Sequence, residues 1–64
     1  MTLSEIKTAL SENKRVFHGS PAYEVKRDNI GQYLIICSLN DYTIGLTHRD
    51  GETMNGKEGE FYIG

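Results

Sequence analysis

The sequence predicts one α+β domain, residues 1–64, in which an N-terminal helix packs on an antiparallel meander of four or five strands. Three observations support this fold class. Apolar side chains recur at helical spacing near the N-terminus, short β-compatible runs separated by turn sequences fill the rest, and 64 residues are too few for two cores. Because consecutive strands joined by tight turns usually pair with each other, we expect a meander, either open or curled into a small barrel.

The helix is predicted over residues 3–12, with a defined start and end. Thr2 and Glu5 match the capping box T-x-x-E, in which each side chain hydrogen-bonds to a backbone N–H of the first turn. Asn13 is expected to end the helix, because asparagine tolerates the left-handed conformation that follows many helices. One face carries the apolar stripe that must pack on the sheet: Leu3, Ile6, Ala9 and Leu10.

Short strands are predicted along the rest of the chain, bounded by residues that favour turns. Tyr23 and Val25 alternate with charged residues, as in a strand with one solvated face. Turn signals separate the strands, notably Gly19-Ser20-Pro21 and the Asp50-Gly51 pair. The predicted strands are residues 15–18, 23–26, 32–37, 41–47 and 61–63, with a brief return segment at residues 53–54.

The strand at residues 32–37 is apolar on both faces. Ile35 and Cys37 share one face, while Leu34 and Ile36 lie on the other. A strand of this kind is usually central in its sheet and covered on both sides. We expect the helix to cover the first face by packing against Val25, Ile35, Ile44 and Leu46.

Leu34 and Ile36 then need a cover of their own, and three are open to them. The last strand, residues 61–63, could fold over them, or the sheet could close into a barrel. Alternatively, a partner protein or a second copy of the chain could pack on these side chains.

Composition and charge exclude several classes of protein. The chain is 38% apolar and 25% charged, with a net charge of −2, which disfavours a basic nucleic-acid-binding protein. The longest apolar run, Leu34–Cys37, is too short to cross a bilayer. Met1 leads directly into a polar segment, which does not fit a signal peptide. We therefore expect a cytoplasmic protein that does not bind membranes or nucleic acid.

No residue pattern predicts catalysis, a cofactor or a metal. Cys37 is the only thiol, and we interpret it as a small core residue rather than a nucleophile. His18 and His48 could form a metal pair with Asp50 or Cys37, but no short chelating motif links them, so surface histidines are favoured. We therefore expect a protein that is not an enzyme.

The glycines and acidic residues of the turns have ordinary structural interpretations. No phosphate-binding glycine motif is present, and Gly45 is expected to mark a bulge or a close crossing by the helix. The spacing of an EF-hand is absent as well. The following side chains are therefore interpreted as solvated turn charges rather than calcium ligands: Asp50, Glu52, Glu58 and Glu60.

The two halves of the chain differ in charge. Residues 1–32 hold five basic and four acidic side chains, whereas residues 33–64 hold two basic and five acidic ones. Because charges steer encounter and aromatic side chains anchor interfaces, an acidic surface in the C-terminal half could meet a basic partner. The candidate interaction residues are Leu34, Ile36, Tyr42, Phe61, Tyr62, Glu58 and Glu60.

A resemblance to known proteins covers most of the chain. The run IGQYLIICSLNDYTIGLTHRDGETMNGK, preceded by SEIKTAL and closed by FYI, resembles small uncharacterised proteins encoded by bacteriophages and bacterial mobile elements. The resemblance implies a phage or bacterial origin and an accessory role, such as binding a defence-system or regulatory factor of the host. It implies no catalytic activity and no site residues.

We therefore expect a non-enzymatic accessory binding protein that contacts a host protein. Two alternatives remain open. In one, Leu34 and Ile36 form the interface of a structural homodimer. In the other, a pocket between the helix and the sheet binds a small molecule.

Overall fold

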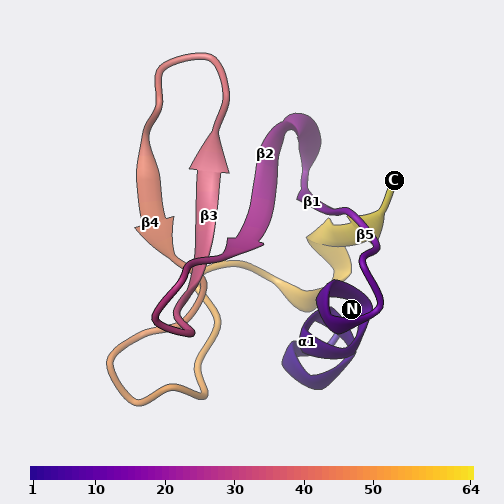
Figure 1. The fold of residues 1–64 in the computed structure, drawn as a ribbon, viewed down its shortest axis with the longest axis vertical. Helices are drawn as coiled ribbons and strands as arrows, with labels where there is room; N and C mark the ends of the chain where they lie inside the picture. Colours follow the sequence, from indigo (N-terminus) through magenta and orange to yellow (C-terminus); the bar gives the residue numbers. More distant parts are fainter.

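The computed structural model describes all 64 residues as one helix packed on a five-stranded antiparallel sheet (Figure 1). The strand order is β4-β3-β2-β1-β5. Strands β1 to β4 therefore form the predicted meander, while β5 returns to the free side of β1, and the sheet does not close into a barrel. The elements are α1 (Leu3–Ser11), β1 (Val16–His18), β2 (Ser20–Arg27), β3 (Tyr33–Cys37), β4 (Thr43–Gly45), the 3₁₀ turn η1 (Glu58–Glu60) and β5 (Phe61–Ile63).

Helix α1 begins and ends as the sequence predicts, within one residue. The Glu5 N–H donates to the Thr2 hydroxyl at 3.1 Å, and the Thr2 N–H donates to the Glu5 carboxylate at 2.7 Å, which confirms the capping box. Asn13 has a φ of 63° and follows the C-cap residue Glu12. Its left-handed backbone turns the chain toward β1, as expected of asparagine at this position.

One face of the sheet forms the core with α1. Strand register aligns one side chain from each strand in a row that begins at the β5 edge. This row is Ile63, Val16, Val25, Ile35 and Ile44. Helix residues pack over it, and the residues that follow β4 complete it. The buried cluster is Ile6, Ala9, Val16, Val25, Ile35, Leu46 and Phe61, with Ile44 partly buried against it, so the predicted packing of the helix is confirmed.

The segment after β4 crosses from the β4 edge of the molecule to the β5 edge (Figure 1). The Leu46 N–H donates to the Tyr33 carbonyl, which extends the β3–β4 pairing by one step and buries the leucine. The return strand predicted at residues 53–54 is reduced to a single bridge between Thr47 and Met54. The 3₁₀ turn η1 carries no sequence signal that we recognised.

Two local predictions are wrong. The turn predicted at residues 19–21 is confined to Gly19, whose φ of 75° reverses the chain, and Pro21 already belongs to β2. The register between β1 and β2 shifts beside Phe17, and proline is tolerated at such an irregular strand start. Gly45 marks neither a bulge nor a close crossing by the helix. The β3–β4 register continues without a shift at Gly45, and the one atom within 4 Å of a β-carbon placed there would be the Thr47 carbonyl oxygen, at 3.2 Å.

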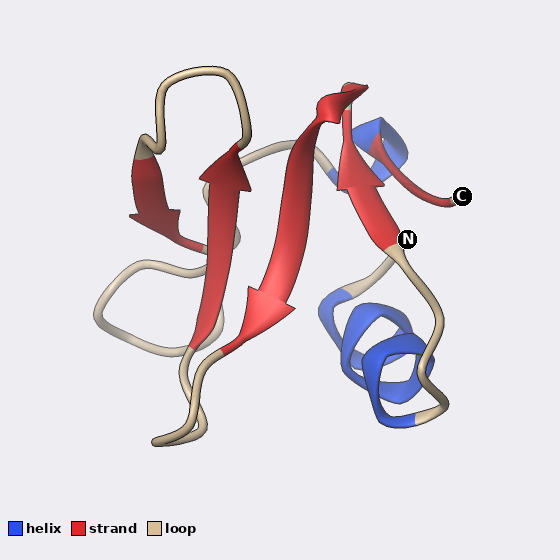
Figure 2. Ribbon diagram, turned by 45° about the horizontal axis from the view of Figure 1, so that its top comes forward, coloured by secondary structure: helices blue, strands red, loops and turns tan.

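The helix covers only part of the sheet. Figure 2 shows α1 beside the β1–β5 half, with no helix over the β3–β4 half. No helix in the structure is long and apolar enough to span a bilayer.

Candidate functional site

The face of the sheet opposite the core has no second layer over it. A row of side chains from all five strands crosses this face: Tyr62, Phe17, Glu24, Ile36 and Thr43. The next row contains Lys26, Leu34 and Gly45. We call these residues, together with Arg15, the open face.

The prediction that strand 32–37 lies in the interior of its sheet is confirmed, because β3 pairs with β4 on one side and β2 on the other. The prediction that this strand is covered on both faces is wrong. Ile35 and Cys37 are 2% and 3% exposed, whereas Leu34 and Ile36 remain half-buried. Because β5 extends the sheet beside β1 instead of folding over these two residues, and because no barrel closes, neither predicted intramolecular cover forms.

The β1 side of the open face satisfies its own groups. The Arg15 guanidinium donates to the Glu24 carboxylate at 2.9 and 3.2 Å and lies 5.1 Å from the centroid of the Phe17 ring. The hydrogen bonds from Arg15 lower the pKa of Glu24 and raise that of Arg15. The ring centroids of Tyr62 and Phe17 are 5.7 Å apart. Gly64 lies so close to the Phe17 ring that a β-carbon on this glycine would clash with it. With these neighbours around it, Phe17 is only 7% exposed.

The β3 side of the open face lacks such a cover. Leu34 and Ile36 stand side by side with polar neighbours around them, Lys26 on β2 and Thr43 on β4. Lys26 takes part in none of the ion pairs of the structure. We call these four residues the Ile36 patch. An apolar centre with a polar rim is the usual composition of a protein–protein interface.

The predicted acidic and aromatic surface is not assembled. Phe61, a candidate interaction residue, is only 3% exposed, because it belongs to the core and stacks on His18 at 4.4 Å. Tyr42 precedes β4 and Tyr62 lies in β5, so the two exposed tyrosines occupy opposite edges of the sheet. The positions of Phe61 and Tyr62 in the sheet depend on the pairing of β5 with β1, and no local pattern in the sequence predicts that pairing.

Of the two predicted acidic interaction residues, Glu60 uses its carboxylate in contacts within the chain, whereas Glu58 contributes only its backbone and keeps an exposed side chain. The Glu60 carboxylate accepts the Lys57 N–H at 3.0 Å and lies 3.1 Å from Nε2 of His18, and these contacts lower the pKa of Glu60. The Glu58 carbonyl accepts a hydrogen bond from the N-terminal ammonium of Met1. Sequence reasoning missed the pairing of His18 with Glu60, because 42 residues separate them.

Asp50 closes the turn after β4. Its carboxylate accepts the N–H groups of Glu52 and Thr53, both at 2.9 Å, and the Thr53 hydroxyl at 2.6 Å. These hydrogen bonds, the Thr53 hydroxyl first, lower the pKa of Asp50 from 3.8 to about 2. The side chain therefore has a structural role in its own turn.

The thiol and the imidazoles do not form a reactive group. Cys37 is free and buried, which confirms its place in the interior. His18 is half-buried against Phe61 rather than on the surface as predicted, whereas His48 is exposed. No three His, Cys, Asp or Glu side chains lie close enough together to hold a metal ion.

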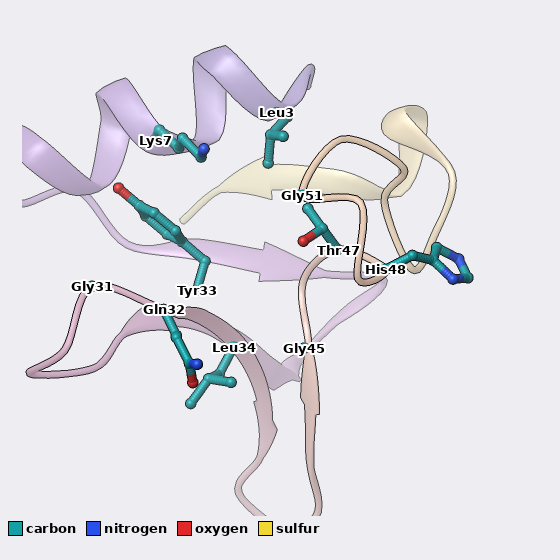
Figure 3. Close-up of a pocket in the computed structure, with 10 residues that line it drawn as sticks. All are labelled: Leu3, Lys7, Gly31, Gln32, Tyr33, Leu34, Gly45, Thr47, His48 and Gly51. Carbon is teal, nitrogen blue, oxygen red and sulfur yellow. The ribbon is translucent and has the colours of Figure 1, made fainter.

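A cavity of about 460 Å³ lies between the helix and one end of the sheet (Figure 3). Its walls come from the first half of α1, the turn before β3, the start of β3 and the chain from β4 to residue 51. The sequence predicted a pocket between helix and sheet as an alternative but named no residues for it. The lining residues are Leu3, Lys7, Gly31, Gln32, Tyr33, Leu34, Gly45, Thr47, His48 and Gly51.

The structure thus has two features to which a function can be attached, the Ile36 patch and this cavity. No protein-family model, curated protein or solved structure matches the chain.

Proposed function

We propose that the protein is a non-catalytic binding domain that docks a partner protein on the Ile36 patch. The observation that carries the proposal is that the fold leaves Leu34 and Ile36 half-buried on a face without a second layer. Removing apolar surface from water contributes about 25 cal/mol per Å², so a partner that covers this patch gains free energy that the chain alone does not.

The charges around the patch indicate which charges a partner surface should carry. Lys26 borders the apolar centre and has no ion-pair partner, whereas Arg15 on the same face is already bound to Glu24. A matching surface therefore combines an apolar centre with a carboxylate that meets Lys26, because complementary charges guide encounter and fix orientation. The acidic partner replaces the basic one predicted from the net charge of the C-terminal half.

The resemblance to phage and mobile-element proteins supports a host protein as the partner. In that setting the chain acts as an accessory protein that binds a regulatory or defence factor. Such a role requires no catalytic group.

Substitution of Ile36 tests the proposal. Tagged wild-type protein and Ile36→Lys are used to capture proteins from a bacterial lysate, and the retained proteins are identified by mass spectrometry. Ile30→Lys is the matched control, because Ile30 is 76% exposed in the β2–β3 turn and lies off the open face. Circular dichroism shows that each variant is folded.

We expect a protein retained by the wild type and Ile30→Lys to be lost with Ile36→Lys. The purified partner should bind the Ile36→Lys variant at least about tenfold more weakly, as expected for a residue at the centre of an interface. Lys26→Glu should also weaken binding, to a smaller extent. Retention of the same proteins by all variants would contradict the proposal.

A second copy of the chain is the other occupant of the patch that must be tested. Light scattering of the purified wild type should show a monomer at micromolar concentration. If the wild type and Ile30→Lys are dimers and Ile36→Lys is a monomer, then a second copy of the chain, and not a host protein, occupies the patch.

A further inference from the structure

The cavity between α1 and β3 has a charge opposite to that of the whole chain. The net charge of the protein is −2, yet none of the ten lining residues is acidic, and one of them, Lys7, is positively charged. A second cation stands at the rim, because the Arg27 guanidinium lies 3.7 Å from the position that a β-carbon on Gly31 would occupy.

Lys7, the lysine that lines the cavity, forms no ion pair with a carboxylate. Its ammonium lies 5.3 Å from the centroid of the Tyr33 ring. Such a contact with an aromatic ring is worth less than a charge-assisted hydrogen bond to an oxyanion. The Lys7 ammonium is therefore available to an anionic ligand.

Two carboxylates that precede lining segments of the cavity in sequence, Asp28 and Asp50, are occupied within their own turns. Asp28 accepts the N–H groups of Ile30 and Gln32 at 3.0 and 2.8 Å. Asp50 accepts hydrogen bonds from Glu52 and Thr53. Neither carboxylate pairs with a basic side chain of the cavity.

Neutral hydrogen-bond donors complete the site. In Figure 3 the Lys7 amine, the Tyr33 hydroxyl and the Thr47 hydroxyl lie around the space between helix and sheet, whereas the His48 ring points away from it. Leu3 contributes an apolar wall from α1. Small-molecule sites have this character, with an apolar part and a few converging polar groups, and typically enclose about 300–1,000 Å³.

We infer that this cavity binds a small molecule through a carboxylate or phosphate group held by Lys7. The Tyr33 ring and Leu3 contact the rest of the ligand, and the Tyr33 and Thr47 hydroxyls offer further hydrogen bonds at separate points of the cavity wall. This site shares Leu34 with the Ile36 patch, but its anchoring cation, Lys7, lies on α1 and not on the open face that carries Ile36.

Titration with inorganic phosphate and with citrate tests the inference. Amide ¹H–¹⁵N spectra of the wild type are recorded at constant ionic strength, so that general screening does not change during the titration. We expect saturable shifts for at least one anion at the lining residues Gly31, Gln32, Tyr33, Thr47 and Gly51. A response to phosphate alone assigns the phosphate class, and a response to citrate alone assigns the carboxylate class.

Lys7→Gln should weaken binding by about tenfold, the usual worth of one hydrogen bond to a charged group. Lys7→Arg should retain it. The matched control is Lys14→Gln, which removes the same charge just after the helix, outside the cavity and beside Glu12. Absence of saturable shifts with both anions, or equal weakening by Lys7→Gln and Lys14→Gln, would overturn the inference. Both outcomes leave the Ile36 proposal unaffected, because its test uses different residues.

Discussion

The two faces of β3 differ in how deeply the fold buries their side chains. Ile35 lies beneath the helix layer and is fully buried, while its neighbour Ile36 points to the open face and is half-buried. Alternation along the strand decides which side chain goes to which face. The number of layers decides whether a face is covered, and a 64-residue chain supplies a layer for one face only.

Truncation of the two neighbours gives the largest expected difference. Ile35→Ala removes a core side chain and should lower the free energy of unfolding by about 2–5 kcal/mol, enough to unfold much of a small domain. Ile36→Ala should cost about 1 kcal/mol, because solvent already reaches that side chain. Urea denaturation followed by circular dichroism measures both. Equal losses at the two positions would mean that the faces are equally covered.

The layer over the core face depends on the helix start. Thr2→Ala removes one half of the capping box and should cost about 1 kcal/mol, because the Glu5 N–H loses its acceptor. Thr8→Ala, at an exposed position within α1, serves as the control and should be neutral or slightly stabilising. Thermal unfolding compares the melting temperatures of the two variants. An unchanged melting temperature for Thr2→Ala would show that the capping box does not stabilise the helix on the sheet.

The smallest effect concerns the Asp50 turn, which follows the buried Leu46. Because folding lowers the pKa of Asp50 from 3.8 to about 2, its contribution to stability is complete above the ordinary pKa and is lost as the pH falls toward 2. Asp50→Asn should therefore melt below the wild type at neutral pH, and the difference should shrink on acidification. Glu52→Gln is the control, since that carboxylate accepts no hydrogen bond in the turn. A difference in melting temperature that stays constant with pH would contradict this role.

Local patterns in the sequence were sufficient to predict the helix and the strands, but they did not predict how these elements are arranged in the sheet. The capping box, the left-handed Asn13 and the buried side of β3 follow from spacing alone, and all are confirmed. The pairing of β5 with β1 brings residues 16–18 beside 61–63, and nothing local to either segment specifies that register.

The candidate sites were predicted less well for the same reason. Leu34 and Ile36 were identified because their strand is apolar on both faces, whereas Phe61 was placed in the interface because aromatic character alone does not tell core from surface. The cavity depends on three distant segments meeting at one end of the sheet, which no spacing in the sequence reveals.

Thiol accessibility tests the open face most directly. The native Cys37 and the thiol of I36C in a Cys37→Ala background are labelled with a thiol reagent under native conditions, at a concentration where light scattering shows a monomer. The account predicts fast labelling of I36C and labelling of Cys37 only when the domain unfolds, because Cys37 lies on the other face of β3 and is only 3% exposed. Equal protection of the two thiols would contradict it, since the face that carries Ile36 would then be covered within the single chain.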